Sequence, residues 1–156
     1  HQIVMRFITK LLSTFFYVGY LPLIPGTFGS LVGILLIYLI ELYALNYVLL
    51  TIAVIAIGFL VCGRAEKAMA KNDPRFVVID EVSGMLLSLV FIPYDIKLVV
   101  LAFILFRVLD TLKPYPAGRL ERLKGSVGIM SDDLIAGLYT NLILQVVLRV
   151  TSFKAS

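Results

Sequence analysis

The sequence has little charge, one histidine and one cysteine. Charged residues make up 15% of the chain against 60% hydrophobic ones, and the mean hydropathy is +1.00. A soluble domain carries about a quarter of its residues as charges, so this composition excludes an ordinary water-soluble fold and indicates a membrane protein. The single Cys62 excludes a disulfide framework, and with His1 as the sole histidine these ligand types cannot build a zinc site.

Long apolar runs are abundant, and they predict an all-α, polytopic membrane bundle with about five transmembrane spans. The length suits a single domain over residues 1–156, with the bundle at 22–150. The predicted spans cover residues 28–43, 47–62, 80–93, 96–109 and 132–150, with a turn around Asn46. The third and fourth are shorter than the roughly 20 residues that cross a bilayer upright, so we expect them to borrow flanking residues or thin the bilayer.

Residues 1–18 have a different pattern from the predicted spans. Apolar pairs recur at helical spacing from Ile3 to Phe16, with Arg6 and Lys10 between them. This period predicts an amphipathic helix. Such a helix can lie in the headgroup layer as an interfacial helix, or it can pack against the bundle, and the residues alone leave both alternatives open.

Basic residues gather in two segments between the predicted spans. They are Arg64, Lys67, Lys71 and Arg75 in the first segment and Lys113, Arg119, Arg122 and Lys124 in the second. Cytoplasmic loops hold the excess of Lys and Arg, so we expect both segments in the cytoplasm. Tyr43, Tyr47 and Tyr94 then form an aromatic belt at the outer surface.

Five carboxylates mark the predicted cytoplasmic ends of the spans: Asp80, Glu81, Asp110, Asp132 and Asp133. Carboxylates near hydrocarbon are costly, and five that converge repel one another unless cations lie between them. Mg²⁺ is a suitable cation, because it prefers oxygen ligands of this kind. The alternative is that the two pairs only complement helix dipoles, with Ser131 as an N-cap for the second pair. Asp110 fits this alternative poorly, because a carboxylate at a helix C-terminus needs a compensating cation, so we favour a metal cluster.

Four glycines predict close helix packing, two of them near these acids. Gly84 and Gly137 each lie one turn after an acid, which permits two helices to approach just beneath the predicted site. Gly29 and Gly33 form a G-x-x-x-G step in the first predicted span, which is typical of a helix-packing face.

Groups that bind phosphate accompany the acids. Arg107 and Lys113 flank Asp110; arginine can fork two hydrogen bonds onto phosphate oxygens, and lysine supplies a point charge. Residues 25–30 place small residues and hydroxyls at a helix start, where free N–H groups attract anions, although this is also an ordinary loop-to-helix turn. With no usable histidine and Cys62 in a predicted span, thiolate and phosphohistidine chemistry are excluded. The expected nucleophile is a metal-activated water or a carboxylate.

Four short motifs together resemble the phosphatidylglycerophosphatase A family of bacterial membrane enzymes. They are Pro25-Gly-Thr-Phe-Gly-Ser30, Asp80-Glu-Val-Ser-Gly84, Phe106-Arg-Val-Leu-Asp-Thr-Leu-Lys-Pro-Tyr-Pro116 and Gly128-Ile-Met-Ser-Asp-Asp-Leu-Ile-Ala-Gly137, and they cover about residues 22–140. The resemblance implies Mg²⁺-dependent hydrolysis of the phosphomonoester of phosphatidylglycerophosphate to phosphatidylglycerol, with the active site facing the cytoplasm. It implies metal or catalytic roles for Asp80, Glu81, Asp110, Asp132 and Asp133, and phosphate binding by Thr27, Arg107 and Lys113. Which acid serves as base stays open.

Two other functions compete with this interpretation. An ion-coupled transporter also has membrane acids, but the middles of the predicted spans are nearly free of charge. A phosphotransferase of lipid headgroups also uses clustered aspartates and Mg²⁺, but the Asp-Gly and Ala-Arg pattern expected of it is absent. The expected partners are the bacterial cytoplasmic (inner) membrane and a phospholipid substrate, with no nucleic acid, and the oligomeric state is left open.

Overall fold

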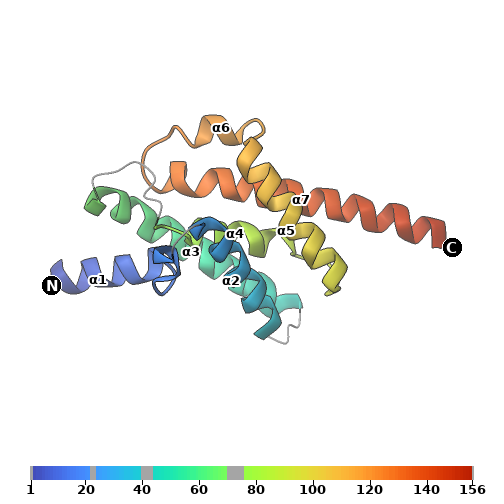
Figure 1. The fold of residues 1–156 in the computed structure, drawn as a ribbon, viewed down its shortest axis with the longest axis horizontal. Helices are drawn as coiled ribbons and strands as arrows, with labels where there is room; N and C mark the ends of the chain where they lie inside the picture. The colour runs from blue at the N-terminus through green and yellow to red at the C-terminus, as the bar shows by residue number, and fades with distance from the viewer. Residues whose placement is uncertain (1, 22–23, 40–43, 70–75, 156) are drawn as a thin grey trace.

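The computed structural model describes residues 2–21, 24–39, 44–69 and 76–155, and every regular element in these ranges is a helix (Figure 1). The elements are α1 (Gln2–Ser13), the 3-10 helix η1 (Val18–Tyr20), α2 (Pro25–Leu39), α3 (Ala44–Met69), α4 (Ile79–Ser88), α5 (Ile96–Leu112), α6 (Ala117–Leu120) and α7 (Ser126–Ala155). The predicted all-α class is confirmed for the described part of the chain.

Helix α4 lies at the centre of the molecule and packs against α2, α3, α5 and α7 (Figure 1). Eight of its ten residues are buried, so it is covered on all sides rather than along one stripe. Met85 and Leu86 of α4 belong to the same buried cluster as Phe106 of α5 and Met130 of α7. Because close-packed interiors resist displacement, this packing holds the first turn of α4 in a defined position.

Helix α4 ends inside the bundle, and polar side chains of its neighbours pair with carbonyl groups at its end and just after it. The Tyr47 hydroxyl donates to Leu86 O, and Asn141 Nδ2 donates to Ser88 O at 3.1 Å and to Val90 O at 2.7 Å. Unpaired carbonyls away from water are costly, so these bonds allow a short helix to end there. The prediction that Tyr47 belongs to an outer aromatic belt is therefore wrong, since the side chain is 6% exposed.

Two helices are long and apolar enough to cross a membrane, with candidate spans at Leu45–Lys67 in α3 and Ser126–Thr151 in α7. Helices α2, α4 and α5 have 15, 10 and 17 residues. At the usual rise per residue they are about 22, 15 and 25 Å long, less than the ~30 Å of a typical hydrocarbon layer. The expected number of about five spans is not confirmed among the described helices.

Helix α3 extends farther at both ends than the sequence predicts. It begins at Ala44, so Asn46 lies in its first turn and not in a turn between spans. It then continues through Arg64 and Lys67, which makes the first part of the expected basic loop helical. Three residues of the predicted topology lie outside the described residues: Tyr43, Lys71 and Arg75.

Helix α7 also begins earlier than predicted. Its first residue is Ser126, six residues before Asp132, and it follows directly on Gly125, whose φ of 78° suits glycine. The predicted start at Asp132 with Ser131 as N-cap is wrong, because helix geometry is already established over the preceding turn and a half. The second pair of acids thus lies inside a helix.

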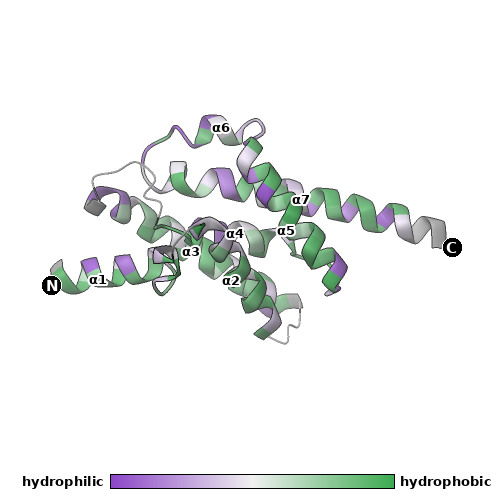
Figure 2. Ribbon diagram, viewed as in Figure 1, coloured by the Kyte–Doolittle hydropathy of each residue, from purple (hydrophilic) through white to green (hydrophobic). Residues whose placement is uncertain are grey.

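Hydrophilic residues gather at one end of the molecule. Figure 2 shows them on α6, at the C-terminal end of α3 and near the start of α7, whereas α2 and α5 are hydrophobic along most of their length. Arg119 lies on α6, and Arg122 and Lys124 line a cavity together with Glu66 near the end of α3. The described parts of the two predicted basic segments therefore lie at the same end of the bundle.

Residues 2–13 form the predicted amphipathic helix α1, and the side that carries Thr9 and Ser13 faces the protein. Thr9 and Ser13 are buried, whereas Ile3 and Phe7 are 84% and 55% exposed, and α1 packs against α3. The alternative that this helix packs against the bundle is thus confirmed for the side that carries Thr9 and Ser13, while Ile3 and Phe7 on the apolar side stay exposed. The helix ends before residue 18 because three consecutive residues have positive φ angles: Phe15, Phe16 and Tyr17.

Candidate active site

Carboxylates from α4 and α7 meet at one point in the bundle. Asp80 and Glu81 lie in the first turn of α4, and Asp133 lies on α7. One carboxylate oxygen from each of these three residues lies within 4.8 Å of the other two, and we call the three residues the carboxylate cluster. Asp80 and Asp133 are 5% and 4% exposed, so protein encloses the cluster.

The crossing of α4 and α7 beneath the cluster has no room for side chains. A Cβ atom built on Gly84 would lie 2.6 Å from the backbone oxygen of Asp133, and one built on Gly137 would collide with the backbone of Gly84. The close approach predicted at these two glycines is confirmed. It brings the first turn of α4 and the Asp133 carboxylate together.

Helix dipoles explain only part of this arrangement. Asp80 and Glu81 do lie at the positive end of α4, and Glu81 N donates to Asp80 Oδ1 at 3.0 Å. Asp132 and Asp133 lie beyond the first turn of α7, where the dipole effect has largely decayed. The dipole alternative therefore fails for the second pair, and their burial calls for another partner.

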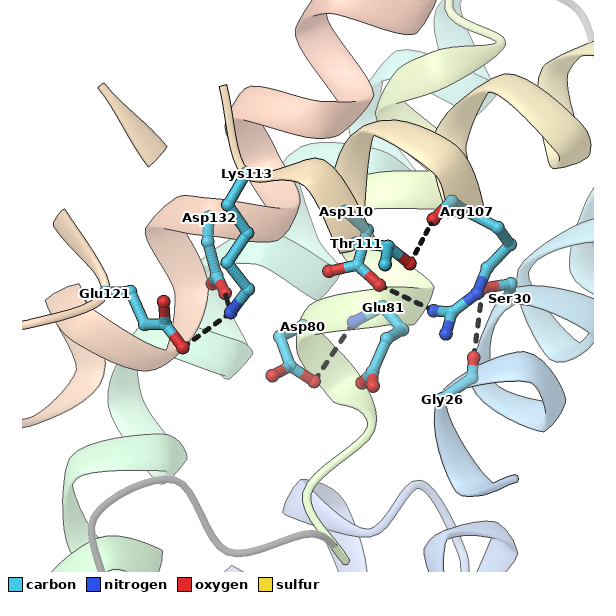
Figure 3. Close-up of polar contacts among 10 residues, drawn as sticks. All are labelled: Gly26, Ser30, Asp80, Glu81, Arg107, Asp110, Thr111, Lys113, Glu121 and Asp132. Carbon is cyan, nitrogen blue, oxygen red and sulfur yellow. Dashed lines mark hydrogen bonds and ion pairs between the residues drawn. The ribbon is translucent and has the colours of Figure 1, made fainter. Parts of the chain in front are cut away.

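The other two acids of the predicted set have cationic partners (Figure 3). Arg107 Nη1 lies 2.8 Å from Asp110 Oδ2, and Lys113 Nζ lies 2.8 Å from Asp132 Oδ2. Asp133 faces the charges of both Asp110 and Asp132. The structure thus brings all five predicted acids to one site, with three of them in the carboxylate cluster and two bridged to cations at its edge.

Lys113 has a second partner that sequence reasoning missed. Its Nζ lies 2.5 Å from Glu121 Oε1 as well as beside Asp132, and its backbone adopts a left-handed conformation that ends α5. Partial burial alone would lower the pKa of Lys113, but the hydrogen bonds to Asp132 and Glu121 outweigh it and raise the pKa above its ordinary value. Lys113 therefore stays charged. No helical or strand spacing links residues 113 and 121, so the sequence carried no signal for this pair.

Four buried side-chain atoms in the described part of the chain have no hydrogen-bond partner: Glu81 Oε2, Asp132 Oδ1, Asp133 Oδ1 and Arg107 Nη1. Arg107 Nη1 forms an ion pair with Asp110, but the geometry of this contact is not that of a hydrogen bond. Buried polar atoms without a hydrogen bond are costly, and these four belong to one site. Their chemistry suits two ligands, because the carboxylate oxygens fit a hard cation such as Mg²⁺ and the guanidinium nitrogen fits an anion.

The start of α2 forms another wall of the site. A Cβ atom on Gly26 would lie 2.6 Å from Glu81 Oε1 and 3.2 Å from Arg107 Nη1, so only glycine leaves space there. Figure 3 shows Arg107 between Asp110 and this turn of α2. Thr27 is half-buried in the same first turn, and the first N–H groups of a helix have no acceptor within the helix, which suits an anion. Its phosphate-binding role stays a prediction.

The predicted packing face of α2 leads from this wall into the bundle. A Cβ atom on Gly29 would lie 3.0 Å from Val78 Cβ, and one on Gly33 would lie 3.0 Å from Met85 Cβ. The G-x-x-x-G step is thus confirmed as a packing face, and it packs against α4.

A cavity of about 120 Å³ opens beside Asp132 at the hydrophilic end of the molecule. It lies between the end of α3, the segment after α6 and the start of α7, and its lining residues are Glu66, Glu121, Arg122, Leu123, Lys124, Gly128, Ile129 and Asp132. Because Asp132 belongs to both, the cavity adjoins the candidate site.

Comparison with known proteins identifies one family whose match contains the whole candidate site. The family model described as phosphatidylglycerophosphatase A matches residues 11–148. Phosphatidylglycerophosphatase A of Escherichia coli K12 is 37% identical over 131 residues, which are 82% of this chain and 76% of that protein. The Haemophilus influenzae protein of the same name is 33% identical over 138 residues, 86% of this chain and 85% of that protein.

A third relative carries a different name. A protein of Bacteroides thetaiotaomicron, provisionally named a phosphatidylinositol-3-phosphatase, is 35% identical over 148 residues, 90% of this chain and 93% of that protein. No solved structure matches the chain. All five acids and both cations of the site lie inside the matched range, whereas most of α1 lies before it.

Proposed function

This chain belongs to the phosphatidylglycerophosphatase A family, and we propose that it hydrolyses the terminal phosphomonoester of phosphatidylglycerophosphate, releasing phosphatidylglycerol and phosphate. The observation that carries the proposal is the enclosed carboxylate cluster, whose Glu81 Oε2 and Asp133 Oδ1 have no hydrogen-bond partner, in one site with Arg107, whose Nη1 is ion-paired with Asp110 but makes no hydrogen bond. Acids and a guanidinium in one site can bind a metal and a phosphate together.

Asp80, Glu81 and Asp133 are the residues that would hold Mg²⁺. Their oxygens are close enough to share one ion, and Mg²⁺ prefers carboxylate oxygens, usually with several waters. A bound Mg²⁺ would neutralise part of the cluster's charge and polarise a phosphoryl oxygen, which lowers the barrier by several kcal/mol in enzymes of this kind. The packing of Gly84 against α7 keeps the three residues in register for this task.

The substrate phosphate would lie between the cluster and α2. Arg107 can offer its N–H groups to two phosphate oxygens, and the backbone N–H groups at the start of α2, near Gly26 and Thr27, would add donors from the other side. Lys113 stays charged and holds Asp132 in place, so it adds positive potential at the edge of the site. These groups orient the phosphate and offset the charge that develops in the reaction.

Hydrolysis breaks the bond from phosphorus to the glycerol oxygen and forms a bond from phosphorus to a water oxygen. The water loses a proton and the glycerol oxygen gains one. Asp110 and Asp132 are available for this transfer, because each has one oxygen beside a cation and lies outside the carboxylate cluster. Asp132 is the better placed, since its Oδ1 is buried and has no hydrogen-bond partner.

We further propose that the protein works as a multi-pass protein of the bacterial inner membrane with this site at the cytoplasmic surface. The candidate spans in α3 and α7 support membrane insertion, and the cations on α6 and around it support a cytoplasmic location of that end. Helices α2 and α5 would cross by thinning the bilayer or borrowing flanking residues. The acyl chains of the substrate could then stay in the bilayer while its headgroup enters the site.

Phosphate release from purified protein in detergent tests the proposal. We expect release from phosphatidylglycerophosphate with Mg²⁺, and loss of release when the metal is chelated. Phosphatidylinositol 3-phosphate is the matched second substrate, because one relative bears that activity in its name. Faster hydrolysis of the inositol lipid would change the assigned headgroup, and no release from either lipid would contradict the phosphatase. Transfer of phosphate to another lipid, without free phosphate, would indicate the phosphotransferase instead.

A further inference from the structure

The apolar side of α1 is exposed in the folded chain. Ile3, Val4, Phe7 and Ile8, which we call the docking face, are 84%, 59%, 55% and 42% exposed. They lie on one side of the helix because their spacing of three and four residues repeats the helical turn. The helix contacts the protein through its opposite side, where Thr9 is buried. Water would disfavour this arrangement, so the face calls for an apolar environment.

We propose that α1 docks on a bilayer surface that contains anionic lipids, with the docking face among the acyl chains. The charge of the helix selects this occupant, since Arg6 and Lys10 are the charged residues of α1 and both are exposed at the border of the docking face. Basic residues next to an apolar face bind anionic membranes, because each cation near the surface is attracted by its negative potential.

An aromatic surface continues the docking face beyond the end of α1. Tyr20 stacks on Phe76 with their ring centroids 4.7 Å apart, and Lys10 Nζ lies 4.9 Å from the Tyr20 ring centroid. Phe16, Tyr20 and Phe76 are 63%, 40% and 42% exposed. Aromatic rings and lysine side chains of this kind are typical of the boundary between hydrocarbon and water, where one end of each side chain is apolar and the other polar.

The docking face is tied firmly to the candidate active site. Val78 N donates to Ser13 O at 3.0 Å, which joins the end of α1 to the residue before α4. Gly19 packs so closely on the backbone of Phe76 that no Cβ atom would fit between them. Asp80 follows two residues after this junction. The depth at which α1 docks is therefore also the depth at which the carboxylate cluster meets the membrane.

A nitroxide label on a cysteine introduced at Phe7 measures this depth directly. The full chain would be placed in lipid nanodiscs of 70% phosphatidylcholine and 30% phosphatidylglycerol; native Cys62 is fully buried, so it should not take the label. We expect the label at residue 7 to be accessible to oxygen and protected from a water-soluble nickel reagent. A label at Lys124, which is exposed and lines the cavity beside Asp132, is the control and should show the reverse.

Matched variants test the apolar and the charged parts separately. With the label moved to Val4, Phe7→Asp should raise access of the nickel reagent several-fold, whereas Phe7→Leu should leave it unchanged. Replacing both Arg6 and Lys10 with Gln should weaken docking about fivefold for each cation lost, and only in discs that contain the anionic lipid.

Three results would overturn the proposal. The first is nickel access at residue 7 equal to that at residue 124. The second is dipolar coupling between labels on two copies, which would show that a second chain covers the face. The third is equal depth in discs of pure phosphatidylcholine, which would remove the role of anionic lipid. None of these measurements depends on phosphate release, so each outcome leaves the proposed enzymatic activity to its own test.

Discussion

Substitution of Gly84 by alanine should damage the site while adding only one methyl group. The new Cβ atom would lie 2.6 Å from Asp133 O and 2.6 Å from Phe106 Cε2, whereas ordinary contact begins at 3.4 Å. The difference, 3.4 − 2.6 = 0.8 Å, is the distance by which α4 and α7 must separate at this crossing. The carboxylate cluster spans this crossing, so Asp133 moves away from Asp80 and Glu81.

The expected loss follows from the tolerance of catalytic geometry. A displacement of about 1 Å costs on the order of a hundredfold in rate, and functional groups must be held within ~0.5 Å. We therefore expect Gly84→Ala to lower kcat/KM between about tenfold and a hundredfold and to raise the Mg²⁺ concentration needed for half-maximal phosphate release. Thermal unfolding in the same detergent would report any loss of fold.

Two control variants isolate the cause. Ser83→Ala changes the buried neighbour of Gly84 without adding an atom, so it should stay close to wild-type activity. Adding Phe106→Leu to Gly84→Ala relieves the ring contact but leaves the backbone contact with Asp133, so activity should stay low. Wild-type kcat/KM and Mg²⁺ dependence in Gly84→Ala would refute the reasoning, because the crossing would then not control the cluster.

Three further predictions test the roles of individual groups. Asp80→Asn and Asp133→Asn should each abolish turnover in protein that still folds, since a lost metal ligand removes several kcal/mol of transition-state stabilisation. A dipole role alone predicts only a stability loss of about 0.3–1 kcal/mol, and near wild-type activity in both variants would make the cluster structural. Arg107→Lys keeps the charge but loses the planar fork, so kcat/KM should fall about ten- to a hundredfold with little change in Mg²⁺ affinity; full activity would reduce Arg107 to a partner of Asp110. Cysteines introduced at Lys124 and Asn46 should label only from the cytoplasmic and only from the outer side, respectively, and the opposite result would reverse the proposed orientation.

Much of the site was predictable because its signals are local. Carboxylates in an apolar chain are costly and therefore informative, and Asp110 at a helix end pointed to the cation that Arg107 supplies. The glycines one turn after Asp80 and Asp133 correctly predicted the crossing of α4 and α7. Side-chain size and charge act over one or two turns, so a short stretch of sequence carries them.

The elements that escaped prediction depend on contacts between distant residues. The pairing of Lys113 with Glu121 depends on the turn that follows α5. The burial of Tyr47 depends on the end of α4, which is 39 residues away in the sequence but lies beside Tyr47 in space. The early start of α7 depended on backbone geometry at Gly125, which composition and hydropathy did not reveal.

The sequence by itself determined the helical class, the membrane character, the identity of the acids and the family, because composition, periodicity and motif spacing are properties of the chain. Only the tertiary structure decided which three acids share one point, which two are bridged to cations, and which side of α1 faces outward. The reason is physical, since these features depend on how closely whole helices approach. That approach is set by the packing of all their side chains together.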